Sequence, residues 1–515
     1  MQYSSEQQII VFGSGNRLAT ARPGSGKTRV LAGHAIQYLV NSSGVLGAVS
    51  FTKDSSAELR GRILAGAGSI NQSRLLTGTF HSLAGKQIRR LPEYRKLRIV
   101  GAGESQFFLR RAMEEVDCDL EFEDAVVQLD AMKSTPDPQM VADQRGMELL
   151  HAYNKLLRDG GCMDFADMIG LAVDGMRQGT IAPLPLDRLL VDEAQDIDGL
   201  QFEWVGLHTA AGAETLVVGD DDQCIYGWRS ALGYDGMLKF VSDFGADHVQ
   251  LSMNYRSGRK ILELAEMVIS KNLKRVDKPL RVGRDFEGTV TVRTASSRED
   301  EIMLIADAVA DDPDSWGVLA RTNSIFRLLE AELITRKIPF NKKGGKSVFE
   351  EGLGEIFCSI LNSIHSGDSR GVMSALIYAG FNGGMFKRLG IKGDMPSIDA
   401  FRIGLERANQ FSRDPSHIRT IHHLNGLWTQ WSKSNNLGRY PGVIDAVRTW
   451  MTNYTSNTGD VALLEGCTRA LNNARFQESG ANLRDRVWAL TGPKNTDSAK
   501  EGVLTCPPIF GPRAI

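Results

Sequence analysis

The chain has 515 residues, of which 42% are hydrophobic and 24% charged, as in an ordinary globular protein. Its 60 basic and 62 acidic residues leave a formal charge of −2, which excludes a generally basic nucleic-acid-binding protein and leaves room only for a local basic patch. It lacks an export signal, a membrane-length apolar run and a C-x-x-C pair among its six cysteines, so we expect a cytoplasmic protein without membrane contact or zinc.

The N-terminal part of the chain alternates strand and helix patterns. Residues 1–85 contain apolar strand candidates at Arg17–Thr20 and Gly44–Phe51, each followed by helical periodicity. Residues 86–160 carry a charged helical pattern with a break at Ser134–Pro138, which predicts a helical insertion.

Parallel-sheet character resumes after this insertion, in three compact apolar runs at Leu186–Val191, Thr215–Val218 and Val249–Leu251. Runs of this kind are typical of strands buried on both faces, and ligand-binding loops follow the carboxyl ends of such strands. The polar residues after each run are therefore candidate site residues.

A second α/β region is expected after about residue 255. It contains a predicted helix at Lys260–Ile269 and predicted strands at Thr289–Thr294 and Gly317–Ala320. Residues 350–490 have mostly helical periodicity, interrupted by Gly, Asn and Ser. The chain shows no internal repeat and no low-complexity tract.

The most informative segment is a glycine-rich loop between the first predicted strand and a helix, here called the phosphate loop: Ala21, Arg22, Pro23, Gly24, Ser25, Gly26, Lys27 and Thr28. Glycine lets backbone N–H groups approach anionic oxygens closely, and the following helix presents its positive end. Lys27 would neutralise the β- and γ-phosphates, and the Thr28 hydroxyl would bind Mg²⁺. Alone, the pattern could also be an ordinary glycine-rich turn.

A second segment, Leu189–Asp196, is an apolar strand that ends in two adjacent acids. Asp192 would hold the metal and Glu193 would polarise a water molecule. The alternative for this segment is a solvated acidic helix start. The order of the two segments along the chain favours a nucleoside triphosphatase that uses Mg²⁺.

The segment Gly219–Arg229 follows another predicted strand. Gln223 could sense the γ-phosphate or the attacking water. Tyr226 and Trp228 offer flat faces on which bases can stack, at about 1–3 kcal/mol per base without sequence preference. The alternative is a turn with a structural aromatic anchor.

Three further segments carry candidate site residues, and the first of them, Asn254–Ser257, follows a predicted strand end. In Asn254–Ser257, Arg256 could stabilise charge on the γ-phosphate and Tyr255 could stack on adenine, although an isolated arginine is usually a surface ion pair. Phe51-Thr52-Lys53 and Thr79-Phe80-His81-Ser82 suit contacts with a single strand of nucleic acid. Each of these would be dismissed alone.

Taken in order, these motifs closely resemble those of the UvrD/Rep-type superfamily 1 DNA helicases, over roughly residues 1–350. The motifs that carry the likeness also include Gln7 and the segment Asp164–Asp167. The resemblance implies an α/β fold: a RecA-like P-loop motor domain with a parallel sheet and a helical insertion, then a partial second RecA-like domain with its own helical insertion. It also implies ATP-driven 3′→5′ movement along single-stranded DNA.

The resemblance assigns roles residue by residue. The catalytic set is Lys27, Asp192, Glu193, Gln223 and Arg256, and the metal ligands are Thr28 and Asp192. Nucleotide-binding positions are the phosphate loop with Gln7, Arg29 and Tyr255. Strand-contacting positions are Phe51, Thr52, Thr79, His81, Tyr226, Trp228 and Arg229. Lys53 and Asp54 stand where the family prefers Asn and Lys, which weakens that DNA contact.

The same likeness gives the expected domain limits: a first motor domain at 1–85 and 161–255, its insertion at 86–160, a partial second motor at 256–349, a second insertion at 350–490 and a divergent tail at 491–515. The family's late arginine motif is not found after Glu501–Cys506, where the sequence turns to Pro507–Ile515. We therefore expect a truncated or frame-shifted helicase that binds ATP but hydrolyses it weakly, since such an arginine contributes about 10³–10⁵ in rate. The alternative is an ordinary disordered terminus, with the arginine supplied by a partner.

Three functions compete. The first is an ATP-dependent DNA helicase acting on single-stranded and forked DNA, with a protein loading partner as a further candidate partner. The second is an ATP-gated single-stranded DNA-binding protein that does not translocate. The third, a P-loop kinase or GTPase-like switch, is disfavoured because it leaves Gly219–Arg229 unexplained.

Overall fold

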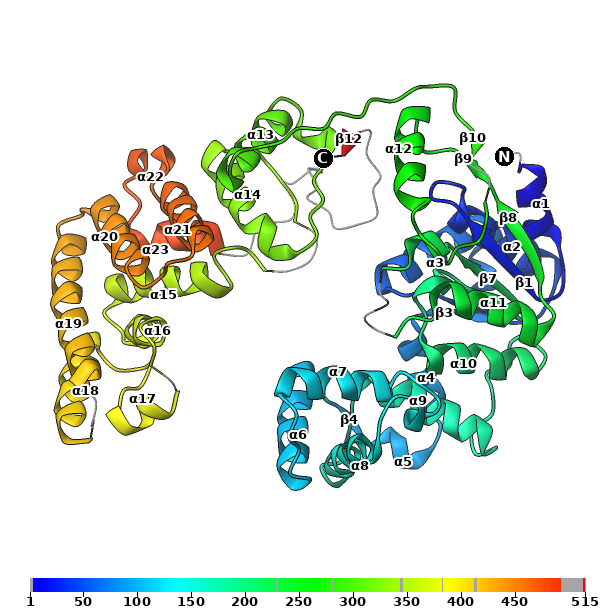
Figure 1. The fold of residues 1–515 in the computed structure, drawn as a ribbon, viewed down its shortest axis with the longest axis horizontal. Coiled ribbons are helices and arrows are strands. Elements are labelled where there is room, and N and C mark those ends of the chain that lie inside the picture. Colours follow the sequence, from blue (N-terminus) through cyan, green and yellow to red (C-terminus); the bar gives the residue numbers. More distant parts are fainter. Residues whose placement is uncertain are drawn as a thin grey trace. The chain divides into compact units, whose positions relative to one another are not determined.

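The computed structural model describes residues 3–225, 227, 230–278, 281–342, 346–381, 383–411, 415–491 and 513–514 (Figure 1). The chain divides into two compact units, Met1–Thr291 and Val292–Ile515. The tail segment Glu501–Cys506, after which the late arginine motif is not found, and the residues Tyr226, Trp228 and Arg229 lie outside the described residues.

The first unit is built on a six-stranded sheet in the order β3-β2-β6-β7-β1-β8. Every neighbouring pair is parallel, so all six carboxyl ends meet at one edge. The strands are β1 (Arg17–Ala21), β2 (Leu46–Val49), β3 (Leu75–Gly78), β6 (Arg188–Val191), β7 (Glu214–Gly219) and β8 (Asp247–Leu251).

Helices cover both faces of this sheet, because side chains alternate between the faces along each strand. One face packs Ala19, Leu190 and Leu216 against α1 (Ser5–Phe12), α2 (Lys27–Asn41) and α3 (Lys53–Ala67). The other face packs the intervening residues, such as Leu18 and Leu189, against four other helices. These are α4 (Phe80–Ile88), α9 (Phe165–Arg177), α10 (Gly199–Ala210) and α11 (Gly233–Phe244).

A helical insertion separates α4 from α9. Its helices are α5 (Pro92–Arg95), α6 (Ala102–Glu115), α7 (Phe122–Met132) and α8 (Gln144–Asp159), and the last three enclose their own apolar core. The short strands β4 (Arg98–Ile99) and β5 (Cys162–Met163) pair in parallel beside it.

The first unit ends with a small appendage after β8. Strand β9 (Met253–Asn254) pairs in parallel with β10 (Arg281–Val282), and α12 (Arg259–Ile269) lies between them in sequence. The described residues of this unit also form short 3₁₀ turns: η1 (Ser69–Arg74), η2 (Pro138–Met140), η3 (Ala194–Asp196) and η4 (Asp221–Gln223).

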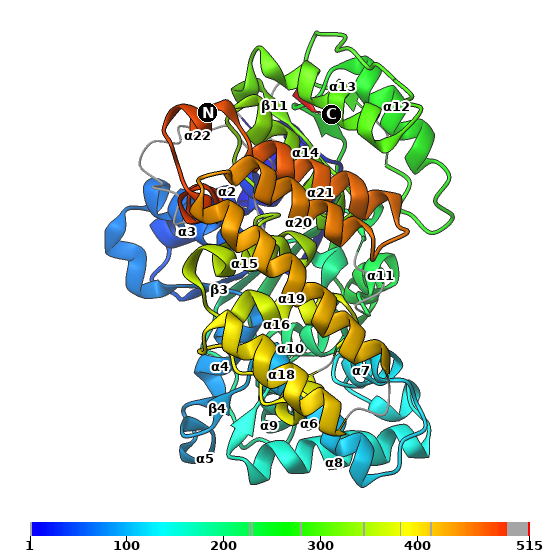
Figure 2. The same ribbon diagram turned by 90° about the vertical axis from the view of Figure 1, so that its left-hand side faces the viewer.

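The second unit begins with α13 (Arg298–Ala310), η6 (Pro313–Ser315), β11 (Trp316–Gly317) and α14 (Asn323–Arg336), which surround one apolar cluster. A larger core holds a helical bundle in which α19 packs between α18 and α20 (Figure 2). The bundle helices are α15 (Gly352–Ser366), α16 (Arg370–Tyr378), α17 (Gly383–Leu389), α18 (Ser397–Phe411), α19 (Pro415–Asn436), α20 (Tyr440–Thr452), α21 (Thr458–Leu471), α22 (Ala474–Glu478) and α23 (Leu483–Thr491). Strand β12 (Arg513–Ala514) pairs in parallel with β11.

The α/β class and the parallel sheet predicted from the sequence are confirmed. Five of the six strands of this sheet coincide with predicted apolar runs. Strand β3 was missed, because Leu-Leu-Thr-Gly is too short to show a period. The strand predicted at Thr289–Thr294 is wrong: these residues form no strand, and Val292 is 83% exposed. An alternating pattern becomes a strand only where a neighbour supplies hydrogen bonds. The strand predicted at Gly317–Ala320 begins one residue earlier and ends at Gly317.

Candidate functional site

The phosphate loop connects β1 to α2 through two glycines in left-handed backbone conformation. Gly24 has φ +73°, and Gly26, the residue before α2, has φ +91°. A Cβ on Gly24 would lie 2.7 Å from the Arg256 Cβ atom, so the loop also needs glycine for space. The start of the 15-residue helix α2 thus follows the loop directly, as an anion site requires.

The loop fits a phosphate group chemically. The buried Ser25 hydroxyl has no hydrogen-bond partner within the part of the chain that the structure describes. A buried hydroxyl without a partner is costly, and a phosphate oxygen would satisfy it. Arg22, by contrast, pairs outside the loop: its guanidinium donates to Glu266 and to the carbonyl of Lys278.

Gln7 on α1 lies against the phosphate loop. Its side chain closes a capping box with Ser4, and its Nε2 donates to the Ser25 carbonyl at 3.0 Å. Arg29, in the first turn of α2, lies with its guanidinium 5.0 Å from the centre of the Tyr3 ring. Gln7 and Arg29, two of the three residues that the resemblance assigns to the base, therefore lie beside the start of α2.

Lys27 and Glu193 form the centre of the site. The Lys27 amine donates to Glu193 at 2.8 Å, and Gln195 Nε2 donates to the same carboxylate oxygen at 3.0 Å. Glu193 itself has a left-handed backbone with φ +53°, an uncommon conformation for glutamate. Burial alone would raise the pKa of Glu193, but the attraction of Lys27 holds that pKa below its ordinary value.

Asp192 is the more buried of the two acids. Burial, helped by the charge of Glu193, raises the pKa of Asp192 to about 7. Thr28 follows Lys27 at the start of α2. No group of three or more His, Cys, Asp or Glu residues suited to a metal is found in the described ranges, so the assignment of Thr28 and Asp192 to Mg²⁺ stays a prediction.

Arg256 reaches the site from the end of β9. Asn254 fixes the turn, since its Oδ1 accepts the backbone N–H groups of Arg256 and Ser257 at 2.8 Å. Its amide donates to the Pro23 carbonyl, and the Tyr255 N–H donates to the Gly24 carbonyl at 2.9 Å. Burial lowers the pKa of Arg256 below its ordinary value, and the negative charge of Glu193 opposes this shift.

Gln223 is joined to this centre through Asp220 and Gln195. Its Nε2 donates to Asp220 at 2.7 Å, and the Asp220 N–H donates to the Gln195 side chain at 2.9 Å. Gln195 in turn contacts Glu193. Four residues of the predicted catalytic set thus come together at the carboxyl edge of the sheet: Lys27 after β1, Glu193 after β6, Gln223 after β7 and Arg256 after β9.

The predicted strand-contacting residues that the structure describes follow the neighbouring strands β2 and β3. Thr52 and Thr79 cap α3 and α4, and their hydroxyls accept backbone N–H groups at 3.1 and 3.3 Å. Phe51 is half-buried beside Thr52. His81 meets Phe165 edge to face at 6.1 Å, and burial lowers the pKa of this histidine.

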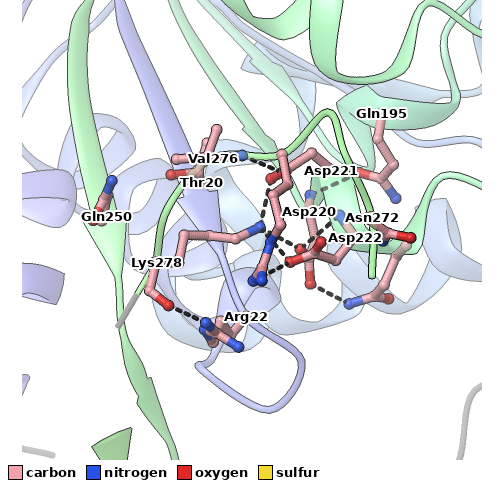
Figure 3. A network of polar contacts seen from close by, with 12 residues as sticks. Thr20, Arg22, Gln195, Asp220, Asp221, Asp222, Gln250, Asn272, Val276 and Lys278 are labelled. Atoms are coloured by element: carbon pink, nitrogen blue, oxygen red, sulfur yellow. Dashed lines mark hydrogen bonds and ion pairs between the residues drawn. The ribbon is translucent and has the colours of Figure 1, made fainter. Parts of the chain in front are cut away.

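Sequence reasoning missed a buried charge network beneath Gln223. Lys278 is 1% exposed and contacts all three acids of Asp220-Asp221-Asp222, as Figure 3 shows. Three consecutive acids after a buried strand were the available signal, because buried carboxylates need counter-charges. Nothing near Lys278 in the sequence marked it as the partner.

No described helix is long and apolar enough to cross a membrane.

Comparison with known proteins identifies two matching family models. Residues 3–245 match the UvrD/REP helicase N-terminal domain, and residues 249–357 match the UvrD-like helicase C-terminal domain. DNA helicase II of Haemophilus influenzae is 30% identical over 384 residues, covering 67% of this chain and 51% of that protein. DNA helicase II of Escherichia coli is 30% identical over 381 residues, covering 67% and 52%. ATP-dependent DNA helicase PcrA of Leuconostoc citreum is 30% identical over 381 residues, covering 67% and 50%. The chain thus spans about half the length of the curated relatives that it matches.

Proposed function

Since the chain belongs to the UvrD/Rep helicase family, we propose that it is an ATP-dependent DNA helicase that moves 3′→5′ along single-stranded DNA. The observation that carries the proposal is the convergence of Lys27, Glu193 and Arg256 beside a glycine loop that ends in a helix start. Three relatives named as DNA helicases support the substrate class.

In this proposal the phosphate loop binds the triphosphate and Lys27 leaves its pairing with Glu193 to neutralise the β- and γ-phosphates. Glu193, released from Lys27, orients and polarises the attacking water. Arg256 and Gln223 face the γ-phosphate and stabilise the charge that develops on it. Thr28 and Asp192 would hold Mg²⁺, which supplies charge neutralisation between the phosphates when bound.

Base recognition is assigned to Gln7, Arg29 and Tyr255 in the same proposal. Strand contact is assigned to Phe51, Thr52, Thr79 and His81, and to Tyr226, Trp228 and Arg229 outside the described residues. Single-stranded and forked DNA are the proposed substrates, with a protein loading partner as a further candidate. The expected domain limits fit this scheme but stay predictions.

The test is ATP hydrolysis by the purified 515-residue chain with and without a single-stranded oligonucleotide. Glu193→Gln is expected to lower kcat about 10²–10⁴-fold, because the general base is lost, while the affinity for ATPγS is retained. The matched control is Glu203→Gln on α10, whose carboxylate pairs with Arg177; it should hydrolyse ATP at the wild-type rate.

Tailed duplexes then separate the competing functions. Unwinding of a 3′-tailed but not a 5′-tailed duplex is expected for the helicase. ATP-dependent DNA binding by a wild-type chain that does not hydrolyse ATP would contradict the helicase and favour the single-stranded DNA-binding protein.

A further inference from the structure

Lys278 is a charged side chain buried in the interior of the first unit. Its amine lies 2.7 Å from Asp220 and 3.3 Å from Asp222, and it also donates to Asp221 (Figure 3). All four side chains are at most 2% exposed. A lysine in such surroundings retains its charge only because the carboxylates compensate its desolvation.

The segment that carries Lys278 is fastened to the same turn at several further points. The Val276 N–H donates to Asp221 at 2.6 Å, and Arg275 pairs with Asp222 at 3.2 Å. Burial alone would lower the pKa of Lys278, but the attraction of Asp220 and the hydrogen bonds raise it above its ordinary value. The amine therefore remains a cation at neutral pH.

Lys278 also contacts the phosphate loop through its backbone. Its carbonyl accepts a hydrogen bond from the Arg22 guanidinium, and Arg22 pairs with Glu266 on α12. On the other side, Asp220 accepts the Gln223 amide at 2.7 Å. One residue thus joins the loop proposed to bind the β- and γ-phosphates to the turn that holds the proposed γ-phosphate sensor.

We propose that Lys278 is a positioning residue that fixes Gln223 relative to the phosphate loop through Asp220 and Arg22. The proposal rests on the proposed ATPase function. Lys278 itself touches no nucleotide; it sets the distance between the two groups that do. The segment continues through β10 to the end of the first unit at Thr291.

The experiment compares Lys278→Met with the wild-type chain. Methionine keeps most of the length of the side chain and removes the amine. We expect kcat to fall about a hundredfold, as for misplacement of a catalytic group by about 1 Å. Affinity for ATPγS should fall about tenfold while ADP affinity changes less than about twofold, because only ATPγS carries the group that Gln223 faces.

The matched control is Lys274→Met, four residues earlier on the same segment. Lys274 is exposed and pairs with Asp235 at 2.8 Å, so its loss should change neither kcat nor the ratio of the two affinities. A merely structural role for Lys278 would lower the melting temperature and the active fraction but leave that ratio unchanged. Equal loss of ATPγS and ADP affinity would overturn the proposal.

A double-mutant cycle with Gln223→Ala adds a second, independent criterion. If Lys278 acts through Gln223, the Lys278→Met change should lower kcat less than about twofold in the Gln223→Ala background. Additive effects of the two substitutions would also overturn the proposal.

Should Lys278→Met fail to fold, Lys278→Met/Asp221→Asn keeps the charge balance of the cluster, and the asparagine oxygen can still accept the Val276 N–H. The same affinity ratio decides the outcome for this variant. A wild-type chain that binds ATPγS but does not hydrolyse ATP would contradict the proposed function. The ratio of the ATPγS and ADP affinities would still test the role of Lys278 in that case. A wild-type chain that binds neither nucleotide would overturn both.

Discussion

At the scale of single residues, the backbone of the phosphate loop needs glycine for two reasons: positive φ angles and the close approach of neighbouring side chains. Gly24 and Gly26 have positive φ values, and Gly24 is also approached closely by Arg256 and by the Asn254 amide. Glu193 also has a left-handed backbone conformation, although this conformation favours glycine. Strained residues of this kind cluster at sites where surrounding contacts hold them, and Glu193 is held by Lys27 and Gln195.

Gly24→Ala tests the loop. A left-handed alanine costs about 1–2 kcal/mol, and its Cβ would displace Arg256, so we expect lower stability together with weaker ATPγS binding. Thermal unfolding and titration with a fluorescent ATP analogue measure the two effects.

The control is Gly61→Ala on the exposed side of α3, where nothing lies within 4 Å of the new Cβ. It should raise the free energy of unfolding by up to about 1 kcal/mol, because alanine is the better helix former. Unchanged nucleotide binding in Gly24→Ala would contradict the assignment of the loop.

At the scale of helices and strands, polar side chains at helix ends hold the site edge together. Thr52 and Thr79 were assigned to DNA contact from the sequence, and in the structure both serve as helix caps. Asp164 and Asp167 form a reciprocal capping box at the start of α9, and Lys133 from the end of α7 pairs with both at 2.6 and 2.7 Å. This pairing links the helical insertion to α9, one of the helices that cover the sheet.

His208 fastens α10 to the segment that precedes β6. The Leu184 N–H donates to its Nε2 at 3.0 Å, so the ring is neutral and its Nδ1–H donates to the Trp204 carbonyl at 2.7 Å. Burial outweighs the backbone hydrogen bond and lowers the pKa of His208 to about 4. In the unfolded chain the ring takes up a proton near pH 6.5.

The stabilisation by neutral His208 is therefore complete above pH 6.5 and is lost as the pH falls from 6.5 towards 4. At about 1.4 kcal/mol per pH unit, the loss reaches about 3 kcal/mol. The measurement is the difference in the free energy of unfolding between wild type and His208→Gln from pH 7 to pH 4. The acids with raised pKa values, such as Asp198, act in the opposite sense but are common to both proteins and cancel.

The control for His208→Gln is His151→Gln, which removes a histidine from the exposed side of α8. If the difference between wild type and His208→Gln did not change between pH 7 and pH 4, the account of the buried ring would be wrong.

At the scale of the whole molecule, the described residues of the proposed nucleotide site lie within the first compact unit, between Gln7 and Arg256, and Lys278 belongs to the same unit. Residues 291–297, which precede α13 at the boundary between the two units, are exposed throughout. The division at Thr291 falls inside the region 256–349 that the sequence suggested as a partial second motor domain, and that assignment stays a prediction.

A fragment ending at Thr291 is therefore expected to fold and to bind ATPγS as the full chain does. Circular dichroism, thermal unfolding and nucleotide titration check this expectation. The same fragment with Lys27→Ala should bind about ten- to hundredfold more weakly, since a charge-assisted hydrogen bond is lost. A fragment that unfolds or fails to bind would show that the second unit is required for the site.

The α/β class, the parallel sheet and the motifs at its carboxyl edge could all be predicted from the order of the amino acids. This was possible because apolar strands and glycine loops are local patterns, and because residues such as Lys27 and Glu193 belong to segments with a recognisable spacing. The helical character of residues 350–490 was predictable for the same reason, since it depends on side-chain periodicity along one element.

Three features emerged only from the folded chain: the residues that neutralise Asp220, Asp221 and Asp222, the capping of helices by Thr52 and Thr79, and the absence of a strand at residues 289–294. Ion pairing and strand pairing are relations between segments that lie far apart in sequence. Lys278 lies more than fifty residues from its aspartates, and no local pattern can indicate which distant charge will be buried against another.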